Sequence, residues 1–62
     1  MKYKITFIKE TEKGTTKEVF DNVVEIAMNS VRILMRYYKN NENNTICIFS
    51  DEYDRFILEA YK

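Results

Sequence analysis

The stretch 22–39, NVVEIAMNSVRILMRYYK, governs how the rest of the chain is interpreted. Its apolar residues recur three or four positions apart, which is the spacing of one face of an α-helix. One such row consists of Val24, Met28, Val31, Met35 and Tyr38, with Ala27 and Leu34 beside it. The polar row consists of Asn22, Glu25, Asn29, Arg32, Arg36 and Lys39. The pattern predicts one long helix over 22–39.

The ends of this stretch carry helix-boundary residues. Asn22 followed by Glu25 has the spacing of a capping box, and the asparagines after Lys39 suit the left-handed position that ends a helix. An alternative stays open, because Val23, Val24 and Ile26 are β-branched. In that interpretation 23–28 continues the preceding strand, and Asn29 or Ser30 caps a shorter helix.

Alternating segments on both sides predict four strands. The first two are Met1–Glu10 and Thr16–Phe20, joined by a turn containing Gly14, the only glycine. With Lys13-Gly14 as a two-residue loop, Lys9 opposes Glu18, Glu10 opposes Lys17, Ile8 opposes Val19 and Phe7 opposes Phe20, so charges and apolar groups match. Strands over Thr45–Ser50 and Arg55–Tyr61 flank a turn at 51–54. The predicted fold class is α+β, ββαββ, with a four-stranded antiparallel sheet and one long helix on one face.

Size and composition limit the chain to a single domain, 1–62. A domain this short has a thin stability margin, which disulfides, metals or partners often supplement. Cys47 is the only cysteine and there is no histidine, so an internal disulfide is excluded and a zinc site is disfavoured. We therefore expect a partner, and no cofactor or metal.

More apolar surface is present than one helix on one sheet face can bury. A third helical row is largely apolar, and so is the sheet face opposite the helix. We expect these residues to form a surface for a homodimer, a higher oligomer or another protein: Val23, Ile26, Ile33, Tyr37, Ile8, Val19, Phe49, Ile57 and Tyr61.

Polar residues suggest further partner contacts. The turn contains Asp51, Glu52, Tyr53 and Asp54, whose spacing does not match a calcium loop but suits contact with a basic surface. Arg32 and Arg36, with Lys39, form a basic stripe on the predicted helix. Such a stripe supports an alternative function in binding nucleic acid, although the ten basic and ten acidic residues give a net charge of zero.

No catalytic constellation is recognisable in the sequence. Histidine is absent, and neither Ser30 nor Ser50 has a partner base. Cys47 lies between two isoleucines of a predicted strand, as expected of a structural thiol. The N-terminal segment alternates and lacks the apolar core of a signal peptide, and no segment is long enough to cross a membrane. We expect a non-enzymatic cytoplasmic protein.

Four segments in this order, KYKITFIKE, VFDNVVEIA, NTICIFSD and RFILEAYK, resemble small proteins of phages and mobile elements of low-GC Gram-positive bacteria. Some of these are anti-CRISPR and other anti-defence proteins that bind and block a host protein, often as dimers. The resemblance covers the chain in outline. It implies an oligomeric inhibitor acting in a bacterial host cell, and it assigns no functional residue.

Overall fold

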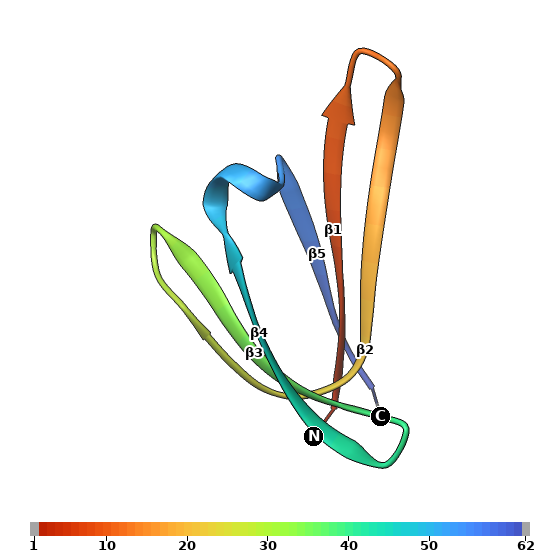
Figure 1. Ribbon diagram of the computed structural model, residues 1–62, viewed down its shortest axis with the longest axis vertical. Helices are drawn as coiled ribbons and strands as arrows, with labels where there is room; N and C mark the ends of the chain where they lie inside the picture. The colour runs from red at the N-terminus through yellow and green to blue at the C-terminus, as the bar shows by residue number, and fades with distance from the viewer. Residues whose placement is uncertain (1, 62) are drawn as a thin grey trace.

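The computed structural model describes residues 2–61, which consist almost entirely of β-strands (Figure 1). The strands are β1 (Tyr3–Thr11), β2 (Gly14–Met28), β3 (Arg32–Lys39), β4 (Glu42–Phe49) and β5 (Arg55–Ala60). One turn of 3₁₀ helix, η1 (Ser50–Glu52), joins β4 to β5 and is the only helical segment among the described residues. The predicted ββαββ fold with a long helix is therefore wrong. Met1, where the first strand was predicted to begin, lies outside the described residues.

The five strands form one antiparallel sheet in the order β4-β3-β2-β1-β5. β2 pairs twice, because its first half lies beside β1 and its second half lies beside β3. The ribbon bends between these halves, so that the sheet forms two walls that meet at an angle (Figure 1). Wall 1 denotes β5, β1 and the first half of β2. Wall 2 denotes the second half of β2, β3 and β4.

The corner between the walls lies at Asn22, whose φ of 56° is in the left-handed region. Both ladders of β2 shift register beside it, between Tyr3 and Ile5 on one side and between Val23 and Glu25 on the other. A bulge of this kind bends a strand, and asparagine adopts positive φ more readily than most residues. The residue predicted to begin a helix therefore marks the bend of β2.

The predicted helix 22–39 is a strand, a turn and a second strand. Along β3, Ile33 and Met35 are buried while Arg32, Leu34 and Arg36 are exposed, which is the two-residue period of a strand. The apparent helical spacing arises because the alternations of two strands are joined by a three-residue turn. The alternative interpretation is confirmed for 23–28, which continues β2, but the short helix after it is wrong.

Asn29 organises the turn between β2 and β3. Its Oδ1 accepts hydrogen bonds from the backbone N–H groups of Val31 at 2.8 Å and Arg32 at 3.0 Å. An N-cap residue makes the same bonds to the second and third residues of a helix. The Asn29 N–H donates to the Arg32 carbonyl at 3.0 Å, which closes a hairpin instead. The sequence thus identified the hydrogen-bonding residue but not the direction of the chain after it.

The β1–β2 hairpin is confirmed, but its predicted register is wrong by two residues. Thr11 pairs with Gly14, so the loop is Glu12-Lys13 and Gly14 follows it with a φ of 126°. The slip keeps every side chain on its predicted face, since the period of a strand is two. Threonines, not charges, consequently oppose Lys9 and Glu10, and Thr16 Oγ1 donates to the Lys9 carbonyl at 3.3 Å.

The loop between β3 and β4, and the strands β4 and β5, agree more closely with the prediction. Asn40 and Asn41, with φ of 54° and 62°, form the two-residue loop between β3 and β4, as a type I′ turn requires. Their left-handed conformation is the one predicted for a helix end. The strand expected over Thr45–Ser50 lies within β4 except for Ser50, which begins η1. β5 ends one residue before the predicted Tyr61.

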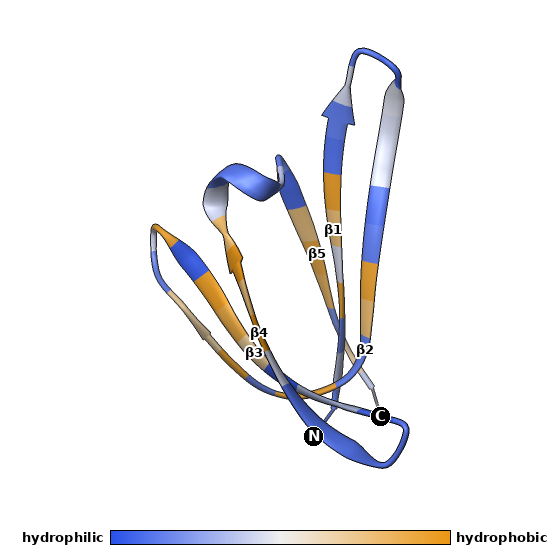
Figure 2. Ribbon diagram, viewed as in Figure 1, coloured by the Kyte–Doolittle hydropathy of each residue, from blue (hydrophilic) through white to orange (hydrophobic). Residues whose placement is uncertain are grey.

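The core lies between the two walls and takes side chains from β1 to β4. Its buried members are Ile5, Phe7, Phe20, Val23, Ile33, Met35 and Ile48. Phe7 is central, with ring centroids 5.0 Å from Tyr53, 6.0 Å from Phe20 and 6.1 Å from Phe56. Figure 2 shows apolar segments in the middle of the strands and polar residues at the β1–β2 and β3–β4 loops. Leu58 lies on the core side of β5 but is 43% exposed.

Candidate protein-binding surfaces

The residues predicted to form the partner surface divide into buried and exposed groups. Val23 and Ile33 are 0% and 1% exposed, and Ile26 and Tyr37 pack against the core. The third apolar row of the predicted helix is therefore part of the interior, because residues 22–39 form a hairpin and not a helix. Ile8 is also buried at 3%, outside the main core cluster. Its cross-strand partners are Lys17 and Arg55, whose aliphatic stems are long enough to cover it.

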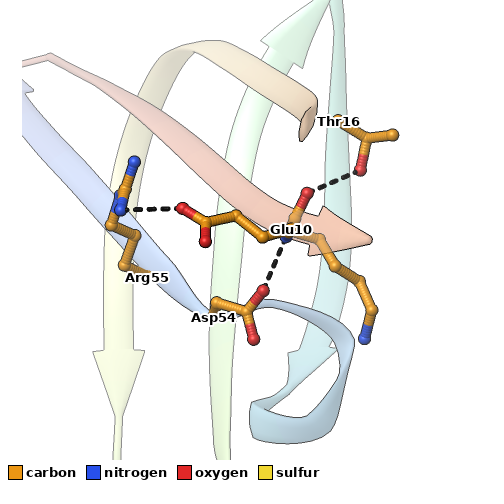
Figure 3. Close-up of polar contacts among 5 residues, drawn as sticks. Glu10, Thr16, Asp54 and Arg55 are labelled. Carbon is orange, nitrogen blue, oxygen red and sulfur yellow. Dashed lines mark hydrogen bonds and ion pairs between the residues drawn. The ribbon is translucent and has the colours of Figure 1, made fainter. Parts of the chain in front are cut away.

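The acidic turn has a structural role in joining the walls. The Asp54 carboxylate accepts the Glu10 N–H at 2.6 Å, and the Asp54 N–H donates to the Ile8 carbonyl at 2.8 Å. Figure 3 shows Asp54 meeting the end of β1, with Arg55 and Glu10 paired at 3.1 Å beside it. Lys9 Nζ donates to the Asp51 carbonyl at 3.0 Å. These bonds attach the segment between β4 and β5 to wall 1.

Glu52 and Tyr53 also make contacts within the protein, although Glu52 is exposed. Glu52 accepts the Phe49 N–H at 2.7 Å, which completes the turn of η1, and the Tyr53 ring packs on Phe7. The Ser50 N–H donates to the Val31 carbonyl at 2.8 Å, so η1 is also tied to the β2–β3 turn of wall 2. Within residues 2–61 no group of His, Cys, Asp and Glu side chains has a geometry that could hold a metal ion.

The outer face of wall 2 carries a compact apolar patch that faces away from the core. Leu34 lies on β3 between Ala27 of β2 and Cys47 of β4, and Phe49 lies beside Arg32 in the next row. Leu34 is 41% exposed and Phe49 is 46% exposed. We call Ala27, Leu34, Cys47 and Phe49 the β3 patch.

Two arginines flank the β3 patch along the strand. Arg32 and Arg36 occupy the positions on either side of Leu34 that share its face. Arg36 is ion-paired with Glu25, its cross-strand neighbour on β2. Lys39 falls on the opposite face by the same alternation, so the basic stripe predicted for a helix is divided. The arrangement now consists of apolar groups bordered by guanidinium groups, which is typical of protein interfaces.

A hollow of about 710 Å³ adjoins the β3 patch along the unpaired edge of the second half of β2. Its lining includes two residues of the β3 patch, the neighbouring Arg36 and three residues from the core side of the sheet: Ala27, Leu34, Arg36, Met28, Tyr3 and Leu58. Met28, at the end of β2, is 50% exposed, and Val31 in the following turn is 57% exposed. Flexible methionine side chains at an exposed position suit a surface that adapts to a partner.

The outer face of wall 1 contains a second, narrower apolar row. Ile57 and Val19 lie opposite Thr6 from its two sides and are 49% and 47% exposed. Tyr61 follows β5, is 38% exposed, and its hydroxyl donates to Asp21 Oδ1 at 2.6 Å. That hydrogen bond, with some burial and the nearby negative charge, raises the pKa of Tyr61 above its ordinary value of 10.0.

The structure thus brings together some predicted partner residues and separates others. Phe49, Arg32 and Arg36 lie on wall 2, while Val19, Ile57 and Tyr61 lie on wall 1. Sequence reasoning missed Leu34 and Ala27 as surface residues, because a helical interpretation of 22–39 placed them beside the row that packs on the sheet. It interpreted Cys47 as a structural thiol and did not include it in the partner surface. The alternation Arg32-Leu34-Arg36 was the signal that could have identified this face.

No helix among the described residues is long and apolar enough to cross a membrane. Comparison of the chain with protein-family models, curated proteins and solved structures gave no match.

Proposed function

We propose that this chain is a non-enzymatic protein-binding module that uses the β3 patch as its docking surface. The observation that supports this most directly is the exposed apolar row on the outer face of wall 2, bordered by Arg32 and Arg36. A typical specific interface covers roughly 800 Å² of each partner, which is about a sixth of the 4848 Å² surface of this chain. The residues of the β3 patch lie on the outer face of wall 2 and are not part of the buried core cluster.

The chemistry of the surface indicates the kind of partner. Leu34 and Phe49 supply apolar contact, and the adjacent hollow can seat a projecting side chain. Arg32 makes no ion pair within residues 2–61, so its guanidinium is available for a carboxylate. We expect a protein partner that presents an apolar anchor with an acidic residue beside it.

A pair of variants tests the β3 patch as the docking surface. Leu34→Glu combined with Phe49→Ser places polar groups at the centre of the patch, while Val19→Glu makes a comparable change on wall 1. Both carry substitutions at exposed positions, so circular dichroism should show the wild-type fold. Affinity capture from the source cells, followed by calorimetry with the purified captured protein, should give at least a tenfold weaker affinity for the wall 2 variant only. Equal affinity for all three chains, or no captured protein, would contradict the proposal.

The narrower hypothesis concerns the identity of the partner. The resemblance to small phage and mobile-element proteins suggests a bacterial defence protein, with CRISPR effectors as the first candidates. Expression of the chain in bacteria whose CRISPR system targets a phage should then restore plaque formation. The variant Leu34→Glu with Phe49→Ser should not restore it, and unchanged immunity with the wild-type chain would exclude this partner class for the system used.

A further inference from the structure

β5 is an edge strand that lacks the proline, lysine or bulge found on many protected edges. Within residues 2–61 only β1 pairs with it, and its other side has no neighbouring strand. Residues 55–60, RFILEA, contain no proline or lysine, and the β1–β5 ladder has no register shift. Five of the six residues are exposed. Edges that must stay single normally carry proline, lysine or a bulge.

The ladder with β1 determines which backbone groups of β5 are free. The Tyr61 N–H donates to the Lys2 carbonyl at 2.8 Å, in register with the pairing of Glu59 with Lys4 and of Ile57 with Thr6. Because hydrogen-bonded positions alternate along an antiparallel strand, residues 57 and 59 turn their backbone groups toward β1. Phe56, Leu58 and Ala60 therefore direct theirs to the open edge.

We propose that two copies of this chain pair antiparallel through β5, with Ile57 opposite Ile57 of the second copy. The N–H and C=O groups of Phe56 then meet those of Leu58 from the second copy, and the reverse holds by symmetry. The product is a twofold dimer in which two five-stranded sheets become one. This inference stands apart from the proposed function, since it uses the edge of wall 1 and leaves the β3 patch free.

The charges on β5 select this register. Arg55 opposes Glu59 of the second copy, and the twofold axis repeats the pair, so two ion pairs flank the central isoleucines. These are non-hydrogen-bonded positions, where opposing side chains approach most closely. A slip of two residues in either direction would place Arg55 opposite Ile57 or Tyr61 and leave both charges without an opposite partner. Slips of one residue would direct the backbone groups of one strand away from the other.

Both charged side chains are available for these pairs. The Glu59 side chain is exposed and makes no hydrogen bond or ion pair within residues 2–61. Arg55 contacts Glu10 through one nitrogen, Nη1, at 3.1 Å, and its side chain remains 62% exposed. A guanidinium group has five N–H donors, so it can bind both carboxylates.

Apolar surface supports the same arrangement. Leu58 points to the core side of the sheet but is 43% exposed, because no strand of the described part of the chain lies beyond β5. In the dimer it would lie opposite Phe56 of the second copy. On the outer face, the row of Val19, Thr6 and Ile57 would continue across the axis into its own image, and the 49% exposure of Ile57 would fall.

Charge exchange between copies tests the register with the full chain. Sedimentation equilibrium at micromolar concentrations should give twice the 7.5 kDa chain mass. Arg55→Glu and Glu59→Arg should each be monomeric alone, since like charges would then oppose each other. An equimolar mixture of the two variants should form a heterodimer, because every acidic side chain then meets a basic one. Arg36→Glu is the matched control, since it removes another exposed arginine that pairs with a glutamate, and it should stay dimeric.

Backbone hydrogen exchange gives a second readout that does not depend on charge. The Leu58 amide should exchange at least tenfold more slowly in the wild-type dimer than in monomeric Arg55→Glu, while the Ile57 amide should be protected in both. Circular dichroism confirms that each variant is folded. A monomeric wild-type chain, an assembly larger than a dimer, or a mixture that stays monomeric would overturn the proposal.

Discussion

Single asparagines control the path of this chain. Asn22, Asn40 and Asn41 are the non-glycine residues with positive φ in residues 2–61, and each lies where the backbone changes direction. The sequence pointed to the first as a helix cap and to the others as a helix end. These roles share the same local chemistry, namely tolerance of left-handed backbone and a short polar side chain. Local chemistry therefore located the boundaries but not the element between them.

We predict that Asn22→Val destabilises the protein by about 1–2 kcal/mol, because a β-branched residue resists positive φ. Asn22→Gly is the control, and it should change the free energy of unfolding by less than about 0.5 kcal/mol, since glycine adopts this conformation freely. Urea unfolding followed by circular dichroism measures both. Equal effects of the two substitutions would show that the bend does not depend on φ at this position.

The hydrogen bond between Tyr61 and Asp21 predicts a pH dependence. Since the pKa of Tyr61 is raised in the folded state, the folded chain binds the phenolic proton more tightly than the unfolded chain does. The contribution of this hydrogen bond to stability is complete below pH 10. It is lost as the pH rises through the higher pKa that Tyr61 has in the folded state. Replacing Asp21 with Asn should lower the pKa of Tyr61 toward 10. NMR titration of the tyrosine ring carbons, with Tyr61→Phe to assign the signal, measures the shift, and an unchanged pKa would contradict it.

At the scale of elements, strands bounded by polar turns were easier to predict than two apolar strands separated by a short turn. β4 and β5 were located to within a few residues, because each shows clean alternation between polar turns. Over 22–39, two alternating segments separated by a three-residue turn imitate helical spacing. The β-branched content of Val23, Val24 and Ile26 was the better guide, since helical spacing alone does not exclude a hairpin.

Alternation along β3 provides an element-scale prediction. Ile33→Ala should cost about 2–5 kcal/mol, because the side chain is 1% exposed and its loss leaves a cavity. Leu34→Ala, the adjacent residue on the outer face, should cost less than about 1 kcal/mol. Denaturant unfolding measures the loss in the free energy of unfolding for each variant. Comparable losses would be inconsistent with a strand that buries every second residue.

At the scale of the whole molecule, one core joins the two walls. Phe7 of wall 1 touches Phe20 and Tyr53, while Ile33 and Met35 of wall 2 belong to the same buried cluster. The segment between β4 and β5 joins the walls again, through the hydrogen bond from Ser50 to Val31 and the one from Asp54 to Ile8. We therefore expect the protein to unfold as one cooperative unit.

Phe7→Ala tests this shared core. Removal of the ring should cost about 3–5 kcal/mol, against a total of roughly 3–9 kcal/mol for a domain of this length. Far-UV circular dichroism, which reports on strands, and tyrosine fluorescence, which reports on packing around Tyr37 and Tyr53, should show coincident transitions in the wild-type protein and a coincident loss in the variant. Separate transitions would mean that the walls unfold independently.

The sequence by itself determined the short-range features of this protein. It located the β1–β2 hairpin, β4, β5 and the asparagine-rich turns, because alternation and turn chemistry depend on neighbouring residues. It also marked Phe49, Ile57 and Val19 as apolar residues directed away from the core.

Only the tertiary structure decided whether 22–39 forms one helix or two strands, which residues pair across β1 and β2, and where the partner surfaces lie. The physical reason is that these features depend on distant contacts. The long strand β2 is stabilised by β1 on one side and by β3 on the other, and it buries Val23 between them. Burial of that apolar surface against partners far along the chain outweighs the helical spacing and the capping residues that favoured a helix.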